Sequence, residues 1–338
     1  MRDLRPLALT MGEPAGIGGE IALKAWLERG SKNVPPFYLI DDPDRLDALK
    51  SRLGWSVPIS SIETPGEALN VFPNALPVLK HPLPRQPIPG TPHHENAGAV
   101  IAAIDLAVEQ VLYGGAEAIV TNPIHKKVLI DAGFNHVGHT DYLAELAGQG
   151  ARAIMMLACS ELRVVPVCVH MSMRESIEKL KIGSITEATR ATAQALASDF
   201  GIEQPHIALT GLNPHAGEGG AMGREEIDII RPAIEQMKRE GLSVRGPEPA
   251  DTLFHERARG GYDAAICMYH DQALIPIKTI DFHGAVNITL GLPFVRTSPD
   301  HGTAFEIAGT GVANDESLIA ALKTASAMAR RRRGAQVR

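Results

Sequence analysis

Short apolar runs alternate with longer helical stretches along almost the whole chain. The apolar runs are continuous, which is typical of parallel strands that are covered on both faces. A repeated alternation of strand and helix predicts an α/β fold with a largely parallel sheet. The candidate strands are 7–11, 37–40, 118–121, 154–158, 164–169, 207–211, 264–268 and 286–290, and the candidate helices are 18–27, 97–112, 186–199, 225–240 and 317–330. Ser184 and Glu187 have the spacing of a capping box and predict the start of the third helix.

A chain of 338 residues is long enough for two domains of about 150 residues each. One segment, 82–92, cannot hold a regular element because it contains five prolines. We expect it to be a surface connection that can reach out to a partner. No other linker marks a domain boundary, so the chain is expected to cross between the domains more than once.

The charge balance argues against a general nucleic-acid binder, since 33 Lys and Arg stand against 39 Asp and Glu. The basic run Arg330–Arg333 is expected to be a solvated tail. The three cysteines are sparse and far apart, which favours a reducing compartment. No apolar stretch reaches the roughly 18 residues of a membrane span. The sequence therefore predicts a cytoplasmic protein without membrane or nucleic-acid partners.

Three histidines follow apolar strands directly. His170, His215 and His270 each lie just past the carboxyl end of a predicted strand, and in open α/β sheets ligands bind at that edge. Three imidazoles with a fourth position open would form a catalytic divalent-metal site. A single histidine at a strand end is more often a hydrogen-bonded structural residue, so the pattern alone leaves both interpretations open.

Two further segments could hold an anion. Lys278, Asn287 and Arg296 lie in one short stretch, and Lys and Arg suit phosphates and carboxylates. The glycine-rich segment 12–20 joins the first predicted strand to the first helix. Its backbone N–H groups could approach an anion, but it matches no dinucleotide or P-loop fingerprint. A tight turn explains it equally well.

The loop 300–314 resembles the adenosine-binding loop of isocitrate and isopropylmalate dehydrogenases. That loop reads His-Gly-Ser/Thr-Ala-Pro-x-x-Ala-Gly and is followed by an Asn. The present chain has Phe305 where the pattern has proline. The resemblance implies an NAD or NADP site, to which it assigns His301, Gly302, Thr303, Ala304 and Asn314.

Several longer motifs resemble the 4-hydroxythreonine-4-phosphate dehydrogenase family from about residue 7 to residue 325. A departure is Gly19, where the family usually has proline, and the basic tail after Ala329 lies outside the pattern. The motifs are Gly-Glu-Pro-Ala-Gly-Ile-Gly (12–18), Thr-Asn-Pro-Ile-His-Lys (121–126), Gly-His-Thr (138–140), Gly-Leu-Asn-Pro-His-Ala-Gly-Glu (211–218), Pro-Ala-Asp-Thr-Leu-Phe (249–254), Tyr-His-Asp-Gln (269–272) and Val-Asn-Ile-Thr-Leu-Gly-Leu-Pro (286–293).

The resemblance implies a specific reaction. The family oxidises the 3-hydroxyl of 4-phosphohydroxy-L-threonine with NAD(P)⁺, and the product loses CO₂ to give 3-amino-2-oxopropyl phosphate in pyridoxal 5'-phosphate biosynthesis. The family's metal ligands correspond to His170, His215 and His270, with Zn²⁺, Mg²⁺ or Co²⁺ as the metal. Its substrate-binding positions correspond to His139, Thr140, Lys278, Asn287 and Arg296. His139 and Asp251 are expected to handle protons, although Asp251 could also be the N-cap of a helix after Ala250.

The resemblance also implies an architecture. Two α/β/α domains with mostly parallel sheets are expected, similar to isopropylmalate dehydrogenase, with the active site in the cleft between them. Residues 1–130 and 292–338 would form the nucleotide-binding domain, and residues 131–291 the metal, substrate and dimerisation domain. A homodimer would complete each metal site, with His170 and His215 from one subunit and His270 from the other.

Three alternatives remain open. Some relatives act on 4-phospho-D-threonate or D-erythronate, or on aromatic cis-dihydrodiols, and Lys278, Asn287 and Arg296 favour a phosphorylated substrate among these. A metal-dependent hydrolase could use the same three histidines without the loop 300–314. A non-catalytic sensor of a phosphorylated metabolite would bind its ligand and leave the nucleotide unreduced.

Overall fold

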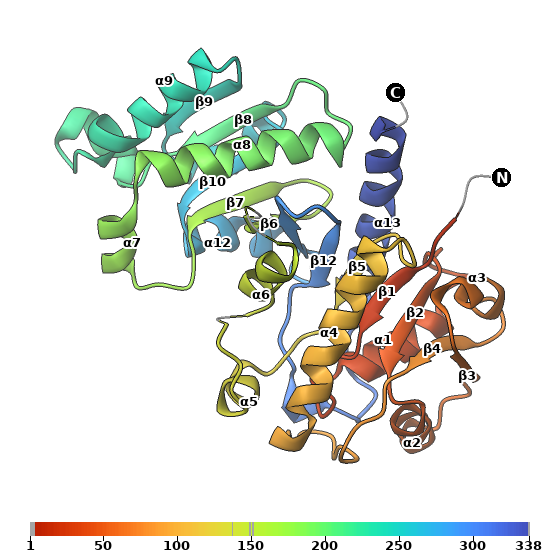
Figure 1. Ribbon diagram of the computed structural model, residues 1–338. Coiled ribbons are helices and arrows are strands. Elements are labelled where there is room, and N and C mark those ends of the chain that lie inside the picture. The colour runs from red at the N-terminus through yellow and green to blue at the C-terminus, as the bar shows by residue number, and fades with distance from the viewer. Residues whose placement is uncertain (1–3, 137, 149, 151, 337–338) are drawn as a thin grey trace. The chain divides into compact units, whose positions relative to one another are not determined.

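A computed structural model describes residues 4–136, 138–148, 150 and 152–336 of the chain (Figure 1). The chain forms two compact units. Unit 1 comprises Met1–Ala153 and Leu292–Arg330, and unit 2 comprises Ile154–Gly291 and Arg331–Arg338. Both units are α/β with mostly parallel strands, which confirms the predicted fold class. In the described part of the chain no helix is long and apolar enough to cross a membrane.

The sheet of unit 1 has the strand order β3–β4–β2–β1–β5–β12. The pairs β1–β2, β1–β5, β5–β12, β2–β4 and β3–β4 are all parallel. The strands are β1 (Leu7–Thr10), β2 (Phe37–Asp41), β3 (Ile59–Ile62), β4 (Leu76–Lys80), β5 (Ile119–Thr121) and β12 (Arg296–Pro299). The helices are α1 (Gly18–Leu27), α2 (Pro43–Leu53), α3 (Ala68–Val71), α4 (Ala97–Leu112), α5 (Lys126–Asp131), α6 (His139–Leu146) and most of α13 (Glu316–Gln336).

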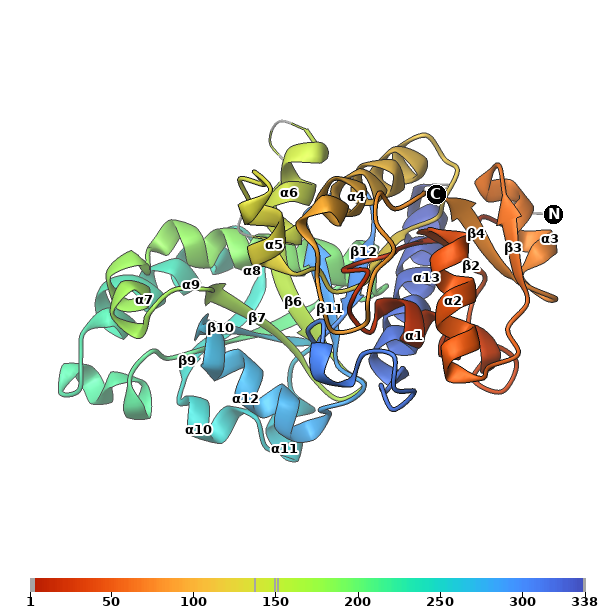
Figure 2. The same ribbon diagram turned by 90° about the horizontal axis from the view of Figure 1, so that it is seen from below.

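Strands β1 and β2 are buried on both faces, as their continuous apolar sequences require. Ala8, Tyr38 and Ile40 pack in one core cluster with the apolar side of α4. The alternate residues of β1 and β2 are equally buried and point to the opposite face. Figure 2 shows α4 on one side of these strands and α1 on the other.

The sheet of unit 2 has the strand order β11–β6–β7–β10–β8–β9. Strand β6 is antiparallel to β11 and β7, whereas the pairs β7–β10, β10–β8 and β8–β9 are parallel. The strands are β6 (Ile154–Ala158), β7 (Arg163–Cys168), β8 (His206–Thr210), β9 (Ser243–Glu248), β10 (Ala264–Tyr269) and β11 (Val286–Leu290). The helices are α7 (Met173–Lys179), α8 (Ile182–Ser198), α9 (Arg231–Arg239), α10 (Ala250–Leu253), α11 (Glu256–Arg259) and α12 (His270–Ile280).

Helix α12 covers one face of the parallel strands of unit 2. Its residues Ala273 and Ile277 pack in a core cluster with Val164 of β7 and with Ala265 and Cys267 of β10. Helix α8 lies on the other face (Figure 2). Because helices cover both faces, ligands can approach these strands only at their ends.

The chain leaves unit 1 later than the boundary that was predicted after residue 130. The segment 131–153 belongs to unit 1 because Phe134 and Leu143 are buried in its core cluster. The hydroxyl of Tyr142 also donates a hydrogen bond to Asp105 of α4. The chain returns to unit 1 at Leu292.

The C-terminal basic run is not simply a solvated tail. Arg332 forms a two-point ion pair with Asp199, whose side chain is 1% exposed. This contact lies within unit 2, so residues 331–338 belong to that unit rather than to the nucleotide-binding part to which the sequence assigns them. A buried carboxylate needs a charged partner, and the run supplies it.

The predicted capping box at Ser184 is wrong. Helix α8 begins at Ile182, after Lys181, so Ser184 lies inside the helix. A capping box does occur nearby, at the start of α7, where Ser172 and Glu175 bond to each other's backbone N–H groups. Asp251 is likewise not an N-cap, because α10 starts at Ala250 with Pro249 before it.

Candidate functional site

The three histidines of the predicted metal site follow neighbouring strands of unit 2. Strands β7, β10 and β8 lie side by side and run parallel. His170 comes two residues after β7, His270 directly after β10, and His215 a few residues after β8. All three therefore lie at the carboxyl edge of the sheet, as predicted, whereas His206 begins β8 at the opposite edge.

Two of these histidines have a strained backbone. His170 has a φ of 52° and His215 a φ of 51°, in the left-handed region that residues with a side chain rarely adopt. His215 is followed by five more residues with positive φ, within the 3₁₀ turn Pro214–Gly220. Such conformations cost about 1–3 kcal/mol each and cluster at functional sites. This supports a functional role for both loops.

Glu226, which sequence reasoning missed, holds the loop of His215. One oxygen of its buried carboxylate accepts hydrogen bonds from the backbone N–H groups of Leu212 and Asn213, each at 2.8 Å. The other oxygen accepts from the Asn213 side chain at 3.0 Å. Burial opposes ionisation of Glu226, but these hydrogen bonds outweigh it and lower its pKa. The carboxylate is therefore charged and fixes the loop.

His270 begins α12 and has a carboxylate beside it. Its Nδ1 lies 2.6 Å from Oδ1 of Asp271, an arrangement that orients the ring and leaves Nε2 as the free ligand atom. Buried Gln272 ties the ends of β8 and β10 together, since it bonds to Thr210, Gly211 and Met268. The Tyr-His-Asp-Gln motif thus places His270 and stabilises the edge from which it projects.

His170 and His270 of one chain lie near each other, with 6.2 Å between their ring centroids. Among the residues that the structure describes, no three His, Cys, Asp or Glu side chains are grouped closely enough to hold a metal ion. The donor set itself fits a divalent metal, because it consists of imidazoles at one sheet edge with a carboxylate behind one of them.

The predicted substrate residues are divided between the two units. His139 and Thr140 begin α6, and Arg296 begins β12, all in unit 1. Arg296 is 3% exposed and donates a hydrogen bond from Nη2 to Oγ1 of Thr121 at 2.6 Å. Burial lowers the pKa of Arg296 to about 10, so its guanidinium remains charged at neutral pH.

His139 is a neutral imidazole beside cations. Its Nε2 is buried and has no hydrogen-bond partner in the described part of the chain. Burial holds the pKa of His139 well below its usual range, and the charges of Arg296 and Lys126 lower it further. Lys126 is a second residue that sequence reasoning did not assign, although it lies in the Thr-Asn-Pro-Ile-His-Lys motif.

The remaining predicted residues lie in unit 2. Lys278 is near the end of α12, with its Nζ 5.2 Å from the ring centroid of Phe282. Asn287 lies in β11, and its buried Oδ1 has no partner among the described residues. A buried amide oxygen of this kind is available to a ligand. Asp251 is exposed on α10.

The predicted nucleotide loop runs over unit 1. Gly302 is exposed, and a Cβ atom there would meet nothing within 4 Å. Ala304 has a φ of 45°, and the ring of Phe305 stands edge-on to His125 at a centroid distance of 5.0 Å. Asn314 lies two residues before α13, and its Oδ1 accepts a hydrogen bond from the N–H of Glu316, the first residue of that helix. Phe305, which stands where the adenosine-loop pattern has proline, thus forms an aromatic contact with His125.

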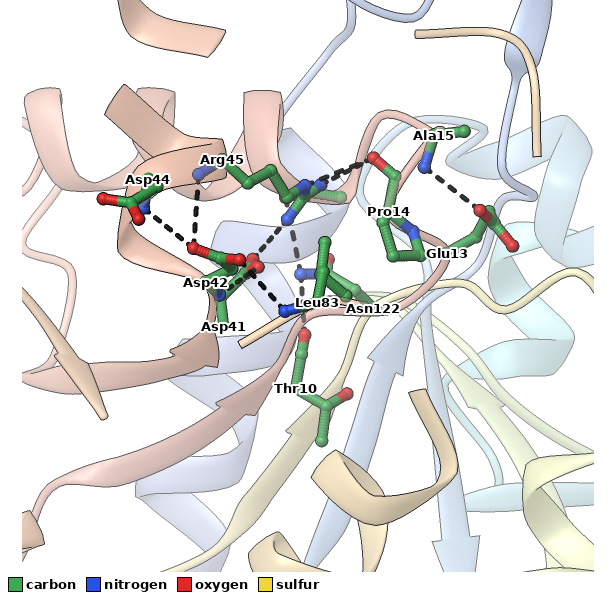
Figure 3. A network of polar contacts seen from close by, with 11 residues as sticks. Thr10, Glu13, Pro14, Ala15, Asp41, Asp42, Asp44, Arg45, Leu83 and Asn122 are labelled. Carbon is green, nitrogen blue, oxygen red and sulfur yellow. Dashed lines mark hydrogen bonds and ion pairs between the residues drawn. The ribbon is translucent and has the colours of Figure 1, made fainter. Parts of the chain in front are cut away.

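The glycine-rich segment is a packed turn rather than an open anion cradle (Figure 3). The carbonyl of Pro14 accepts from the buried guanidinium of Arg45, which also pairs with Asp41. The Nδ2 of Asn122 donates to the carbonyl of Thr10. A cavity of about 330 Å³ lies beside this turn, between α2, the segment 86–89 and Gly309. The proline-rich segment therefore lines a cavity of unit 1, to which it is joined by the bond from Gly90 N–H to the Ala15 carbonyl.

Comparison with known proteins matches residues 33–325 to the family described as pyridoxal phosphate biosynthetic protein PdxA. The chain is 53% identical to a 4-hydroxythreonine-4-phosphate dehydrogenase of Methylorubrum extorquens, over 97% of this chain and 96% of that protein. It is 36% identical to the crystal structure of the Klebsiella pneumoniae enzyme of that name, with a TM-score of 0.86 over 96% of this chain and 100% of the other.

A terephthalate 1,2-cis-dihydrodiol dehydrogenase from Burkholderia xenovorans is more distant. It is 27% identical, with a TM-score of 0.63, over 96% of this chain and 98% of that one. The family resemblance drawn from the sequence motifs is thereby confirmed. The chain belongs to the family of the pyridoxal phosphate biosynthetic protein PdxA, the 4-hydroxythreonine-4-phosphate dehydrogenases.

Proposed function

We propose that the chain oxidises 4-phosphohydroxy-L-threonine at its 3-hydroxyl with NAD(P)⁺ and releases CO₂ and 3-amino-2-oxopropyl phosphate. The observation that carries this proposal is the placement of His170, His215 and His270 after three adjacent parallel strands. The names of the most similar relatives, at 53% identity, support the same substrate. The 27% identity to the dihydrodiol dehydrogenase makes that substrate class the less favoured one.

The three histidines would hold one divalent cation, Zn²⁺, Mg²⁺ or Co²⁺. When bound, such a cation acts as a Lewis acid toward the substrate hydroxyl and the carbonyl formed from it. The chain's part is to fix the imidazoles. Asp271 orients His270, Glu226 holds the loop of His215, and the capping box of α7 follows directly after His170.

The substrate would be held by charged and polar groups on both units. In unit 1 these are Arg296, His139 and Thr140, and in unit 2 they are Lys278 and Asn287. His139 is neutral because its pKa lies well below the usual range, so in a proton transfer it would act as the acceptor. Asp251, which is exposed on α10, would be the second residue that handles protons.

The loop with His301, Gly302, Thr303, Ala304 and Asn314 would bind the nucleotide. When bound, NAD(P)⁺ accepts the hydride. The open space around Gly302 supports this assignment, because a backbone without a side chain lets a ligand approach closely. The bond from Ile17 N–H to the Thr303 carbonyl fixes one side of the loop.

A homodimer would complete the metal site. Helix α12 begins at His270 and exposes Ile275, at 64%, while Phe282 just beyond its end is 67% exposed. Exposed large apolar side chains of this kind favour a protein partner. A second copy that covers this part of α12 would bring its own residues close to His270.

The direct test is formation of reduced nucleotide with a panel of substrates. The panel contains 4-phosphohydroxy-L-threonine, 4-phospho-D-threonate, 4-phospho-D-erythronate and a cis-dihydrodiol, each with and without chelator. We expect turnover of the first, loss of turnover with chelator, and recovery with Zn²⁺, Co²⁺ or Mg²⁺. Hydrolysis without nucleotide reduction would identify a hydrolase, and ligand binding without turnover a sensor.

The sharing of the metal site is tested by mixing inactive variants. His170→Ala, His215→Ala and His270→Ala are unfolded and refolded in pairs. If His270 comes from the partner subunit, only the mixtures that contain His270→Ala regain activity. If His215 comes from the partner instead, as the proximity of His170 and His270 would allow, only the mixtures with His215→Ala recover. No recovery in any pair, with heterodimers demonstrated, places all three ligands in one chain.

A further inference from the structure

Lys126 lies beside the start of α6, and its ammonium group pairs with no carboxylate among the residues that the structure describes. It is the first residue of α5 and is exposed. A Cβ atom on Gly138 would lie 3.3 Å from Cε and 3.6 Å from Nζ of Lys126, so the ammonium group is next to the residue before His139. The neighbouring Lys127 differs, because its Nζ pairs with Asp131 at 2.8 Å.

Two further groups of unit 1 belong to the same cluster. Arg296 and Lys126 are the two cations whose charges act on His139. The guanidinium of Arg296 is buried and oriented by Thr121, and Nε2 of His139 is buried without a partner among the described residues. Two cations and an unpaired imidazole nitrogen, from α5, β12 and α6, thus gather at one place. Cations and an unpartnered imidazole nitrogen in one place are groups to which an anion can bind.

We infer that Lys126 is a further substrate-binding residue, which with Arg296 and His139 holds the phosphate group of the substrate. The inference deepens the proposed function and rests on its substrate class. Neither the relatives' names nor the sequence motifs assign a role to Lys126.

Phosphate fits this cluster better than carboxylate does. A phosphate has three terminal oxygens and a charge of about −1.5 to −2 at neutral pH, so three donors from separate segments can each bind one oxygen. A carboxylate is planar and is usually bound through two parallel hydrogen bonds by a single Arg. Lys126 approaches as a point charge on a flexible stem, which is the manner in which lysines bind phosphate.

The inference is tested by calorimetric titration of the full-length protein with inorganic phosphate. A hydrogen bond to a charged group contributes about 1.5–3 kcal/mol, so Lys126→Met is expected to raise the Kd for phosphate about tenfold to a hundredfold. Lys126→Arg should keep most of the affinity. Lys127→Met is the matched control, because it removes the adjacent charge, and it should leave the Kd unchanged.

Formate serves as the carboxylate probe in the same titrations. Binding of formate should depend little on Lys126; an equal loss for formate and phosphate would overturn the choice of phosphate. Phosphate binding that is the same in Lys126→Met as in the wild type, or undetectable in a folded wild-type protein, would overturn the role of Lys126.

Turnover separates this inference from the proposed function. With 4-phosphohydroxy-L-threonine, Lys126→Met should raise KM about tenfold or more and change kcat much less. If the protein binds phosphate through Lys126 but does not oxidise this substrate, the proposed function fails and the inference stands. If it oxidises the substrate with an unaltered KM in Lys126→Met, the inference fails and the function stands.

Discussion

The guanidinium of Arg45 fills the space beside Gly19. A Cβ atom at Gly19 would lie 2.9 Å from Nη2 of Arg45 and 3.1 Å from a methyl group of Leu49. Arg45 cannot easily move away, since it pairs with buried Asp41 and donates to the carbonyl of Pro14. The family usually has proline at this position. In this chain the missing side chain of Gly19 leaves room for the buried guanidinium of Arg45.

Gly19→Ala is expected to destabilise the protein. Displacing packed atoms costs about 1–3 kcal/mol, while alanine gains up to about 1 kcal/mol over glycine in a helix. The expected net loss in free energy of unfolding is about 1 kcal/mol, measured by urea denaturation. Gly98→Ala is the matched control, because Gly98 is also the second residue of a helix and has nothing within 4 Å of its Cβ position. It should stabilise, and a gain in both variants would contradict the packing argument.

Elements with long apolar sequences could be predicted from the sequence. The bounds of β6 and β11 agree with the prediction, as do those of α1 and α4. Strands β3, β4, β9 and β12 were not predicted. In β12 the polar residues Arg296 and Thr297 are buried because their side chains bond to Thr121 and to the carbonyl of Ala321. These hydrogen-bond partners are brought together only by the tertiary fold, so the sequence around β12 does not indicate a buried strand.

Some residues of the candidate site could also be predicted from the sequence, and others could not. Histidines after parallel strands are predictable because those strands share one carboxyl edge. Glu226 and Lys126 were missed for a different reason. Glu226 is many residues after the backbone groups that it binds, and Lys126 faces His139 only because the segment 131–153 packs in unit 1. The predicted boundary after residue 130 separated these two residues.

The nucleotide loop is tested by Gly302→Val. Gly302 has open space around its Cβ position, so the substitution should leave the folded state intact. A valine there would obstruct the approach of a bound nucleotide to the backbone. We expect the KM for NAD(P)⁺ to rise several-fold while the KM for the substrate changes little. Unaltered nucleotide kinetics in a stable variant would place the cofactor elsewhere.

Glu226→Gln tests the support of the His215 loop. The substitution keeps the size of the side chain but turns an N–H₂ group toward the Asn213 amide, which itself donates to Glu226. Loss of a group that positions a metal ligand typically lowers metal affinity about 10–100-fold. Titration with Zn²⁺ measures this directly. Asp228→Asn, on the exposed ion pair with Arg224, is the control and should bind Zn²⁺ as the wild type does.

The low pKa of His139 predicts a pH dependence of stability. The unfolded chain protonates this histidine near its ordinary pKa of 6.5, whereas the folded protein resists protonation. Below that value the unfolded state binds more protons, so stability is lost as the pH falls. His139→Gln should remove this loss, and its urea stability should fall less than that of the wild type between about pH 7 and pH 5. His283→Gln, at an exposed histidine, should still show the wild-type slope.

The ion pair between Asp199 and Arg332 predicts a role for the C-terminal basic run in stability. Nε and Nη2 of Arg332 lie 2.8 and 2.6 Å from the two carboxylate oxygens, and Ser198 donates to the same carboxylate at 2.8 Å. The Asp199 side chain is 1% exposed, so removal of its partner leaves a buried charge. The expected loss in free energy of unfolding for Arg332→Ala is about 3 kcal/mol.

Two further variants separate this ion pair from a general effect of the tail. Arg330→Ala removes an exposed charge of the same run and should change stability by less than about 0.5 kcal/mol. Adding Asp199→Asn to Arg332→Ala removes the buried charge and should restore part of the lost stability, because the neutral amide costs less to bury than an unpaired carboxylate. Equal losses for Arg330→Ala and Arg332→Ala, in urea denaturation at neutral pH, would show that the pair contributes nothing specific.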